Sequence, residues 1–245
     1  ESYQGIMDGL RKSIQTFFPN EKLKFKFILA TKNLAISNED LERLKNIGGL
    51  HLNDENIEYF FELYSQLGQA SKYQFLGNIF DGQEIPQMEN KVPAVRGKMG
   101  GHIYYSFSIE PEKLLKIGYV LHRNKANINM MPTYQRLIKK SRLKSVEDFI
   151  ENDNGYFPNS IVISIDAKNC QFDHADTQVK STISDVGILH LPKKYKSAFI
   201  IDGQHRLYGY SNTSYKDKNT IPVVAFVNLS REEQVKLFMQ INENQ

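Results

Sequence analysis

The chain has 245 residues, 40% of them hydrophobic and 24% charged, which is the composition of a soluble globular protein with room for a real core and more than one domain. No apolar run approaches the roughly 18 to 20 residues of a membrane helix and no signal peptide is visible, so we expect no membrane partner. Cys170 is the single cysteine. It excludes an internal disulfide framework and a cysteine-rich zinc site, and the reducing cytoplasm is the expected compartment.

The net charge is only +3, but its distribution is one-sided. Between Glu112 and Glu147 there is no acidic residue, whereas lysines and arginines recur throughout this segment. Such a block repels itself unless it is spread over a solvated face or meets an anion such as DNA, RNA or a nucleotide, and both alternatives stay open. For DNA as the partner, the predicted contacts are Arg123, Lys125, Lys139, Lys140, Arg142 and Lys144.

Residues 1–80 predict a small α/β segment. Apolar residues at helical spacing predict an amphipathic helix over 3–17, and "KLKFKFILAT" (22–31) predicts a strand that enters a core. Three helices are expected after this strand, and the first of them has a capping-box-like start at Ser37 and Asp40.

Residues 81–101 contain four glycines and two prolines and are predicted to be a linker. The "GKMGG" in this segment lacks both the GxxxxGK[ST] spacing and the preceding strand of a phosphate loop. Residues 102–245 then alternate helices with buried strands, which predicts an α+β domain with a mixed sheet. Its strands are expected at 102–109, 157–165 and 221–227, with a strand pair formed by 187–191 and 197–201 around a Lys-rich turn; its helices are expected at 110–123, around 146–150, after 202 and at 230–242.

The stretch "AFIIDGQHRLYGYSN" (198–212) is the segment with the clearest signs of a functional rather than a purely structural role. An apolar strand ends at Asp202, and Gly203 permits a tight turn with positive φ. The polar residues that follow at a predicted helix start are Gln204, His205 and Arg206. A helix N-terminus favours anions, and an arginine fork suits phosphate or carboxylate. Asp202 is expected to orient His205 or Arg206, or to help hold a metal that carries the phosphates. The structural alternative makes Asp202 a helix cap, places Arg206 in a surface ion pair and leaves His205 merely packed.

"DGQHR", followed by a short helix, a strand, an acidic helix and "NENQ", resembles the DGQHR-domain proteins, which include the DndB-like proteins associated with DNA phosphorothioate modification and phage-defence loci. The arrangement is also similar to the ParB/sulfiredoxin fold, in which a Gly-x-x-Arg segment is followed one strand and one helix later by a Glu-Asn-x-x-Arg box. The resemblance covers roughly 104–245, and the chain ends before an arginine that would complete the second box. A sulfiredoxin reaction needs a cysteine beside the His-Arg pair, and the motif has none.

The resemblance implies binding of nucleotide phosphate, of DNA, or of both, and it leaves NTP hydrolysis with Mg²⁺ open. Asp202, His205 and Arg206 are then the expected catalytic residues. Arg206 would neutralise phosphate, His205 would orient or protonate, and Asp202 would coordinate or orient. The expected ligand-binding residues beside Arg206 are Gly203, Gln204, Gln135, Arg136, Asn244 and Gln245. No separate metal site is predicted.

The N-terminal segment, with a Lys-flanked strand that ends in "ATKN" and helices on both sides of it, resembles the distal part of a restriction-endonuclease-like core. The catalytic strands of such a nuclease would precede residue 1, and "EKLK" (21–24) matches a Glu-x-Lys pattern only at the start of a strand. An inert structural domain is therefore the default expectation.

Because the chain begins at Glu1 without a methionine and stops at "INENQ" in what reads as a helix end, we expect a piece of a longer protein. Three functions stay open. The first is a DGQHR protein that binds NTP or DNA through the motif. The second is a nuclease whose metal site lies N-terminal to this piece, and the third is a non-enzymatic DNA-binding regulator. Whether the chain is a homo-oligomer also stays open.

Overall fold

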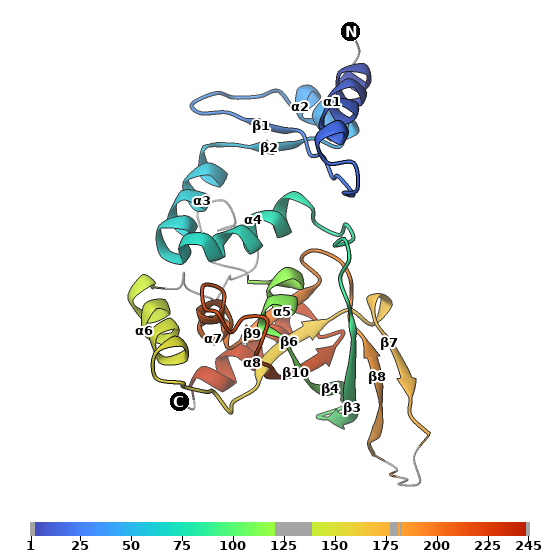
Figure 1. Cartoon of the computed structure of the whole chain (residues 1–245), viewed down its shortest axis with the longest axis vertical. Coiled ribbons are helices and arrows are strands. Elements are labelled where there is room, and N and C mark those ends of the chain that lie inside the picture. Colours follow the sequence, from blue (N-terminus) through green and yellow to red (C-terminus); the bar gives the residue numbers. More distant parts are fainter. Residues whose placement is uncertain (1–2, 121–138, 177–180, 182, 244–245) are drawn as a thin grey trace. The chain divides into compact units, whose positions relative to one another are not determined.

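The computed structural model describes residues 3–120, 139–176, 181 and 183–243, and it divides into two compact units at Asp54 and Glu55 (Figure 1). The smaller unit contains α1 (Tyr3–Phe17), β1 (Ile28–Ala30), α2 (Asn38–Asn46) and β2 (Leu50–Leu52). β1 and β2 pair in parallel, so only the apolar end of the strand predicted over 22–31 has a ladder partner. Ser37 caps α2 as predicted, because its hydroxyl accepts from the backbone N–H of Asp40 at 3.1 Å.

The larger unit is built on a mixed sheet whose strand order, among the described residues, is β5-β9-β6-β10-β4-β3-β8-β7. The α+β class with a mixed sheet is therefore confirmed. The strands are β3 (Lys91–Met99), β4 (His102–Ile109), β5 (Gly118–Tyr119), β6 (Ile161–Ile165), β7 (Gln171–His174), β8 (Asp185–His190), β9 (Ala198–Asp202) and β10 (Ile221–Val227). The helices are α3 (Asp54–Leu67), α4 (Ser71–Ile79), α5 (Pro111–Ile117), α6 (Lys140–Glu151), α7 (Gln204–Tyr210) and α8 (Arg231–Glu243).

The segment 81–101, predicted as a linker, contains β3, which pairs with both β4 and β8. Its glycines mark a turn inside the sheet: Gly100 and Gly101 both have positive φ and connect β3 to β4. This segment is therefore part of the sheet rather than a spacer between domains.

The predicted pairing of 187–191 with 197–201 is wrong. β8 pairs with β3 and β7, whereas β9 pairs with β5 and β6, so four other strands lie between them in the sheet. The Lys-rich turn between the two strands instead forms an antiparallel bridge from Lys194 to Glu84. Proximity in the sequence favoured a hairpin, but the apolar ladders available elsewhere in the sheet decided the pairing.

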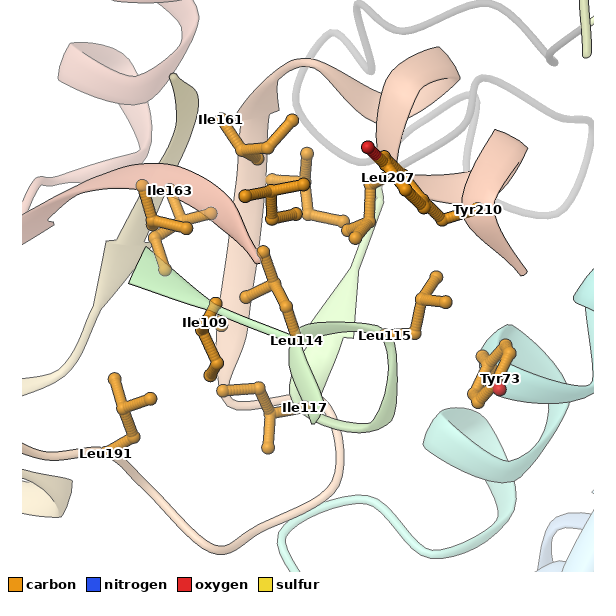
Figure 2. Packing of buried hydrophobic residues seen from close by; sticks show 14 of the residues in the cluster. Tyr73, Ile109, Leu114, Leu115, Ile117, Ile161, Ile163, Leu191, Leu207 and Tyr210 are labelled. Atoms are coloured by element: carbon orange, nitrogen blue, oxygen red, sulfur yellow. The ribbon is translucent and has the colours of Figure 1, made fainter. Parts of the chain in front are cut away.

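Both faces of β9 are buried, and this fixes the strand that leads into the polar motif. Ala198 and Ile200 belong to the main core, which Figure 2 shows packed around Leu114 and Leu115 of α5. Neighbouring side chains on a strand point to opposite faces, so Phe199 and Ile201 lie on the other face. Those residues pack with α8, in a cluster that contains Phe199, Ile201, Leu237 and Phe238.

Candidate functional site

The motif, Asp202–Arg206, begins at the end of β9, which lies between β5 and β6 in the sheet. The antiparallel register of β9 with β6 shifts between Val162 and Ile163, immediately beside Asp202. Such an irregularity re-aims the chain that follows it, and β-bulges are frequent next to functional sites. α7 then begins at Gln204, as the motif predicted.

Gly203 connects β9 to α7 in a conformation that only glycine adopts at low cost. Its φ is 90° and its ψ is 13°, which is the left-handed region. A Cβ placed on it would lie 2.5 Å from Cδ1 of Ile161 and 3.1 Å from Nη2 of Arg206. The missing side chain therefore permits both the turn and the close approach of the arginine.

Arg206 folds back over this turn and binds groups of the protein itself. Its Nη2 donates to Oδ2 of Asp202 at 2.8 Å, and its Nη1 donates to the carbonyl oxygen of Asn159. Both charged side chains are mostly buried, with 18% of Arg206 and 23% of Asp202 exposed. In this structure the two charges neutralise each other, and Arg206 ties the motif to the segment that enters β6.

Gln204 and His205 have a different environment. The Gln204 side chain is buried, and among the described residues its Oε1 accepts no hydrogen bond. A buried polar atom without a partner is uncommon in a folded protein and calls for a physical explanation such as a ligand or ordered water. Burial and, to a smaller extent, the charge of Arg142 lower the pKa of His205 to about 4, while Asp202 opposes the change. At neutral pH the imidazole is therefore uncharged.

α6 and α7 lie side by side and point in the same direction. Asn212, just after α7, donates to Glu147 at 2.6 Å, and the hydroxyl and N–H of Ser214 donate to Glu151 at 2.8 and 2.9 Å. The two hydrogen bonds from Ser214 lower the pKa of Glu151.

One further contact allows this close packing. Gly209 of α7 packs against Val146 of α6, where a Cβ would overlap the valine. Residues further along α6 therefore contact residues further along α7 and the turn after it. This order shows that the two helices run in parallel.

This parallel alignment brings the start of α6 to the start of α7. Arg142, in the first turn of α6, lies close enough for its charge to lower the pKa of His205. Lys139, Lys140 and Arg142 are all exposed, and the first turn of α6 has no acidic residue and no side-chain cap. The backbone N–H of Lys140 donates to the Gln66 side chain at 3.0 Å. Cations at a helix N-terminus are unfavourable because the positive end of the helix dipole lies there.

The other predicted site residues fall into two groups. Lys144 is exposed and pairs with Asp148 at 2.9 Å, one turn along α6. The predictions for Arg123, Lys125, Gln135, Arg136, Asn244 and Gln245 lie outside the described residues.

Sequence reasoning missed one residue pair that holds α7 in place. The fully buried hydroxyl of Tyr208 accepts from Nε2 of Gln74 in α4, and Oε1 of Gln74 accepts from the backbone N–H of Val120 at 3.5 Å. Burial raises the pKa of Tyr208, and the Gln74 contact opposes this change. Because 134 residues separate the pair, no local pattern could have indicated it.

Comparison with known protein families relates this site to a biological process. A family model described as "DndB: DNA-sulfur modification-associated" matches residues 92–245, which is well over half of the chain. The chain belongs to the DndB family. The match contains the motif, α6 and nearly all of the main sheet, and it connects this DndB-family chain to DNA-sulfur modification. No curated protein and no solved structure matches the chain, so the likeness to the ParB/sulfiredoxin fold stays a prediction.

Two further properties of the described residues concern metals and membranes. No three histidine, cysteine or acidic side chains are grouped there in a way that could hold a metal ion. None of the helices that the structure describes is both long and apolar enough to cross a membrane.

Proposed function

We propose that this chain contributes to DNA-sulfur modification by binding phosphate groups, of DNA or of a nucleotide, at the surface where α6 and α7 begin. The observation that carries the proposal is the parallel alignment of the two helices. It gathers two positive helix ends and three exposed cations, Lys139, Lys140 and Arg142, with no acidic residue in the first turn of α6. A bound phosphate relieves the repulsion that this arrangement otherwise creates.

Each member of the motif then has a distinct role. Asp202 and Arg206 hold the turn through their mutual ion pair, and Gly203 makes room for it. Gln204 offers its buried oxygen to a donor on the ligand, such as the amino group of a base. His205, uncharged at neutral pH, acts as a hydrogen-bonding group rather than as a cation. The expected contributions of Gln135, Arg136, Asn244 and Gln245 remain part of this proposal.

NTP hydrolysis is a finer expectation that the family resemblance adds. The described residues do not offer a metal site of their own, and Asp202 is already engaged by Arg206. A Mg²⁺ ion would therefore arrive with the nucleotide, held chiefly by its phosphates. Association with phage defence is likewise an expectation of the same resemblance, whereas location in the cytoplasm is the expectation drawn from the single cysteine.

The test compares two double variants that each remove two positive charges. Lys140→Ala/Arg142→Ala changes the proposed surface, and Lys98→Ala/Lys218→Ala changes exposed lysines elsewhere in the larger unit. Fluorescence anisotropy with a labelled DNA duplex, over a series of salt concentrations, reports DNA binding. Calorimetric titration with ATP, GTP and CTP, with and without Mg²⁺, reports nucleotide binding, and release of inorganic phosphate reports hydrolysis.

We expect the α6 variant to lose about tenfold or more in affinity, and its salt slope to fall by about 2, because two phosphate contacts disappear. The control variant should change affinity by less than about twofold. Equal losses in the two variants would mean that binding follows overall charge, and the proposal would then be wrong. A loss confined to the nucleotide or to the duplex identifies which phosphate source the surface uses.

A further inference from the structure

A polar cleft lies at the opposite end of β9 from the motif. It has a volume of about 390 Å³ and is formed by the turn before β9, the short 3₁₀ turn that leads into β7, and the loop before β3. Leu191, labelled in Figure 2 among the packed core residues, is almost fully buried and belongs to its wall. Since β9 spans five residues at about 3.3 Å each, the cleft and the motif are separated by roughly 15 Å or more.

Among the charged side chains that line this cleft, cations outnumber anions. Lys168, Lys193 and Lys194 contribute three ammonium groups, and Glu84 is the single carboxylate among the lining residues. Lys168 and Lys193 are exposed, and within the described part of the chain neither forms an ion pair. Lys194 donates to Oδ1 of Asn169 at 3.1 Å, which leaves the amide nitrogen of Asn169 as a further donor. Three like charges around one hollow repel each other unless an anion binds between them.

The backbone of the Lys-rich turn is held on both sides. The carbonyl of Lys193 accepts from the N–H of Ile85 at 2.7 Å, and the N–H of Tyr195 donates to the carbonyl of Gln83 at 3.0 Å. Two hydrogen bonds also join Asn90 and Leu191, one through the backbone at 2.8 Å and one through the asparagine side chain at 2.6 Å. A ligand would therefore meet lysines on an ordered backbone, and binding would lose little conformational entropy there.

The donor set favours phosphate among the anions. The lining residues include no arginine, and three separate ammonium groups around one hollow suit an anion that carries more than one charge and several acceptor oxygens, as phosphate does. Lysine ammonium groups act as point charges and are common partners of phosphate. A volume near 390 Å³ lies in the lower part of the roughly 300 to 1,000 Å³ range of ligand pockets. It suits a mononucleotide or a short run of nucleic-acid backbone.

We propose that this cleft is a phosphate-binding site, separate from the surface where α6 and α7 begin. Lys168, Lys193 and Lys194 supply the charge and the Asn169 amide supplies a directed donor. This proposal does not depend on the proposed function, because it rests on different residues at the other end of β9. The phosphate belongs either to a mononucleotide or to a DNA strand, and the experiment has one arm for each source.

The test uses the double variant Lys168→Ala/Lys193→Ala, because both side chains are exposed and their removal leaves no buried group without a partner. Lys98→Ala/Lys218→Ala again controls for the loss of two charges. Inorganic pyrophosphate and AMP are titrated by calorimetry, and a fluorescein-labelled duplex is titrated by anisotropy. Lys140→Ala/Arg142→Ala, measured in parallel, distinguishes binding in this cleft from binding at the surface where α6 and α7 begin, called the motif surface below.

We expect the cleft variant to bind at least one probe about tenfold more weakly, while the control changes by less than about twofold. A loss with pyrophosphate and AMP identifies a small phosphorylated ligand, and a loss with the duplex alone identifies the DNA backbone; either result supports the site. The proposal is overturned if the cleft variant equals the control with every probe, or if the unmodified chain binds none of them. If only the α6 variant loses binding, phosphate binds at the motif surface and not in the cleft.

Discussion

Replacing Arg206 by alanine tests whether this residue primarily holds the turn. The change removes two charge-assisted hydrogen bonds, one to Asp202 and one to the carbonyl of Asn159, and leaves a mostly buried carboxylate without its cation. Hydrogen bonds to charged groups contribute about 1.5 to 3 kcal/mol each when buried, and partial exposure reduces this, so we expect a loss of about 2 to 4 kcal/mol. Arg206→Lys keeps the charge but not the fork and should lose about 1 to 2 kcal/mol.

Urea unfolding of the purified chain measures this effect. With a slope of about 2 kcal/mol per M, the midpoint for Arg206→Ala should fall by about 1 to 2 M. A double-mutant cycle with Asp202→Ala should give a coupling energy of about 1 to 2 kcal/mol. Arg142→Ala, an exposed arginine, is the matched control and should change stability by less than about 0.5 kcal/mol. If Arg206→Ala also stays below about 0.5 kcal/mol yet loses phosphate binding, the arginine acts on the ligand and this reasoning is wrong.

Two further predictions concern the same turn. Burial, with help from Arg142 and against Asp202, lowers the pKa of His205 to about 4. The unfolded chain, with a histidine pKa near 6.5, is therefore protonated first as the pH falls. The stabilisation should be present above about pH 6.5 and lost between there and about pH 4, by about 1 to 2 kcal/mol after solvent screening of the partly exposed ring. His205→Gln should flatten the pH dependence of the urea midpoint in this window, and an unchanged slope would contradict the burial argument. Gly203→Ala should lose about 2 to 4 kcal/mol in the same unfolding assay, since it adds an overlap with Ile161 to the cost of a positive φ. Gly100→Ala, with positive φ but open space around it, should lose only about 1 to 2 kcal/mol, and equal losses would show that the overlap has no effect.

Local signals in the sequence were sufficient to predict several structural features near the site. The helix predicted over 230–242 is present as α8, and Ser230 and Glu233 form a capping box at its start, with two hydrogen bonds at 2.7 and 3.3 Å. The strand, the glycine turn and the helix start at Gln204 also lie where the motif predicted them. The capping box and the Asp202–Arg206 pair across the glycine turn connect residues within four positions of one another, so the local sequence specifies them.

The features that bring the site together have no such local origin. Arg142 and His205 meet because α6 packs against α7, and this packing depends on the absence of a side chain at Gly209 and on the distant pair Glu151 and Ser214. The sequence showed the acid-free block and the motif separately, but nothing in their spacing shows that they lie together. Strand pairing was missed for the same reason, because ladders between strands far apart in the chain are decided by which apolar surfaces fit.

The geometry also changes which residues should supply affinity for an anion. Asp202 and Arg206 stand four positions apart, on either side of the glycine turn, and their ion pair closes that turn. The net charge of this pair is zero, so the arginine of the motif adds little attraction for phosphate beyond a short range. The uncompensated charge comes instead from the first turn of α6. Variants of Arg206 should therefore lose stability before affinity, whereas variants of Lys140 and Arg142 should lose affinity with stability unchanged.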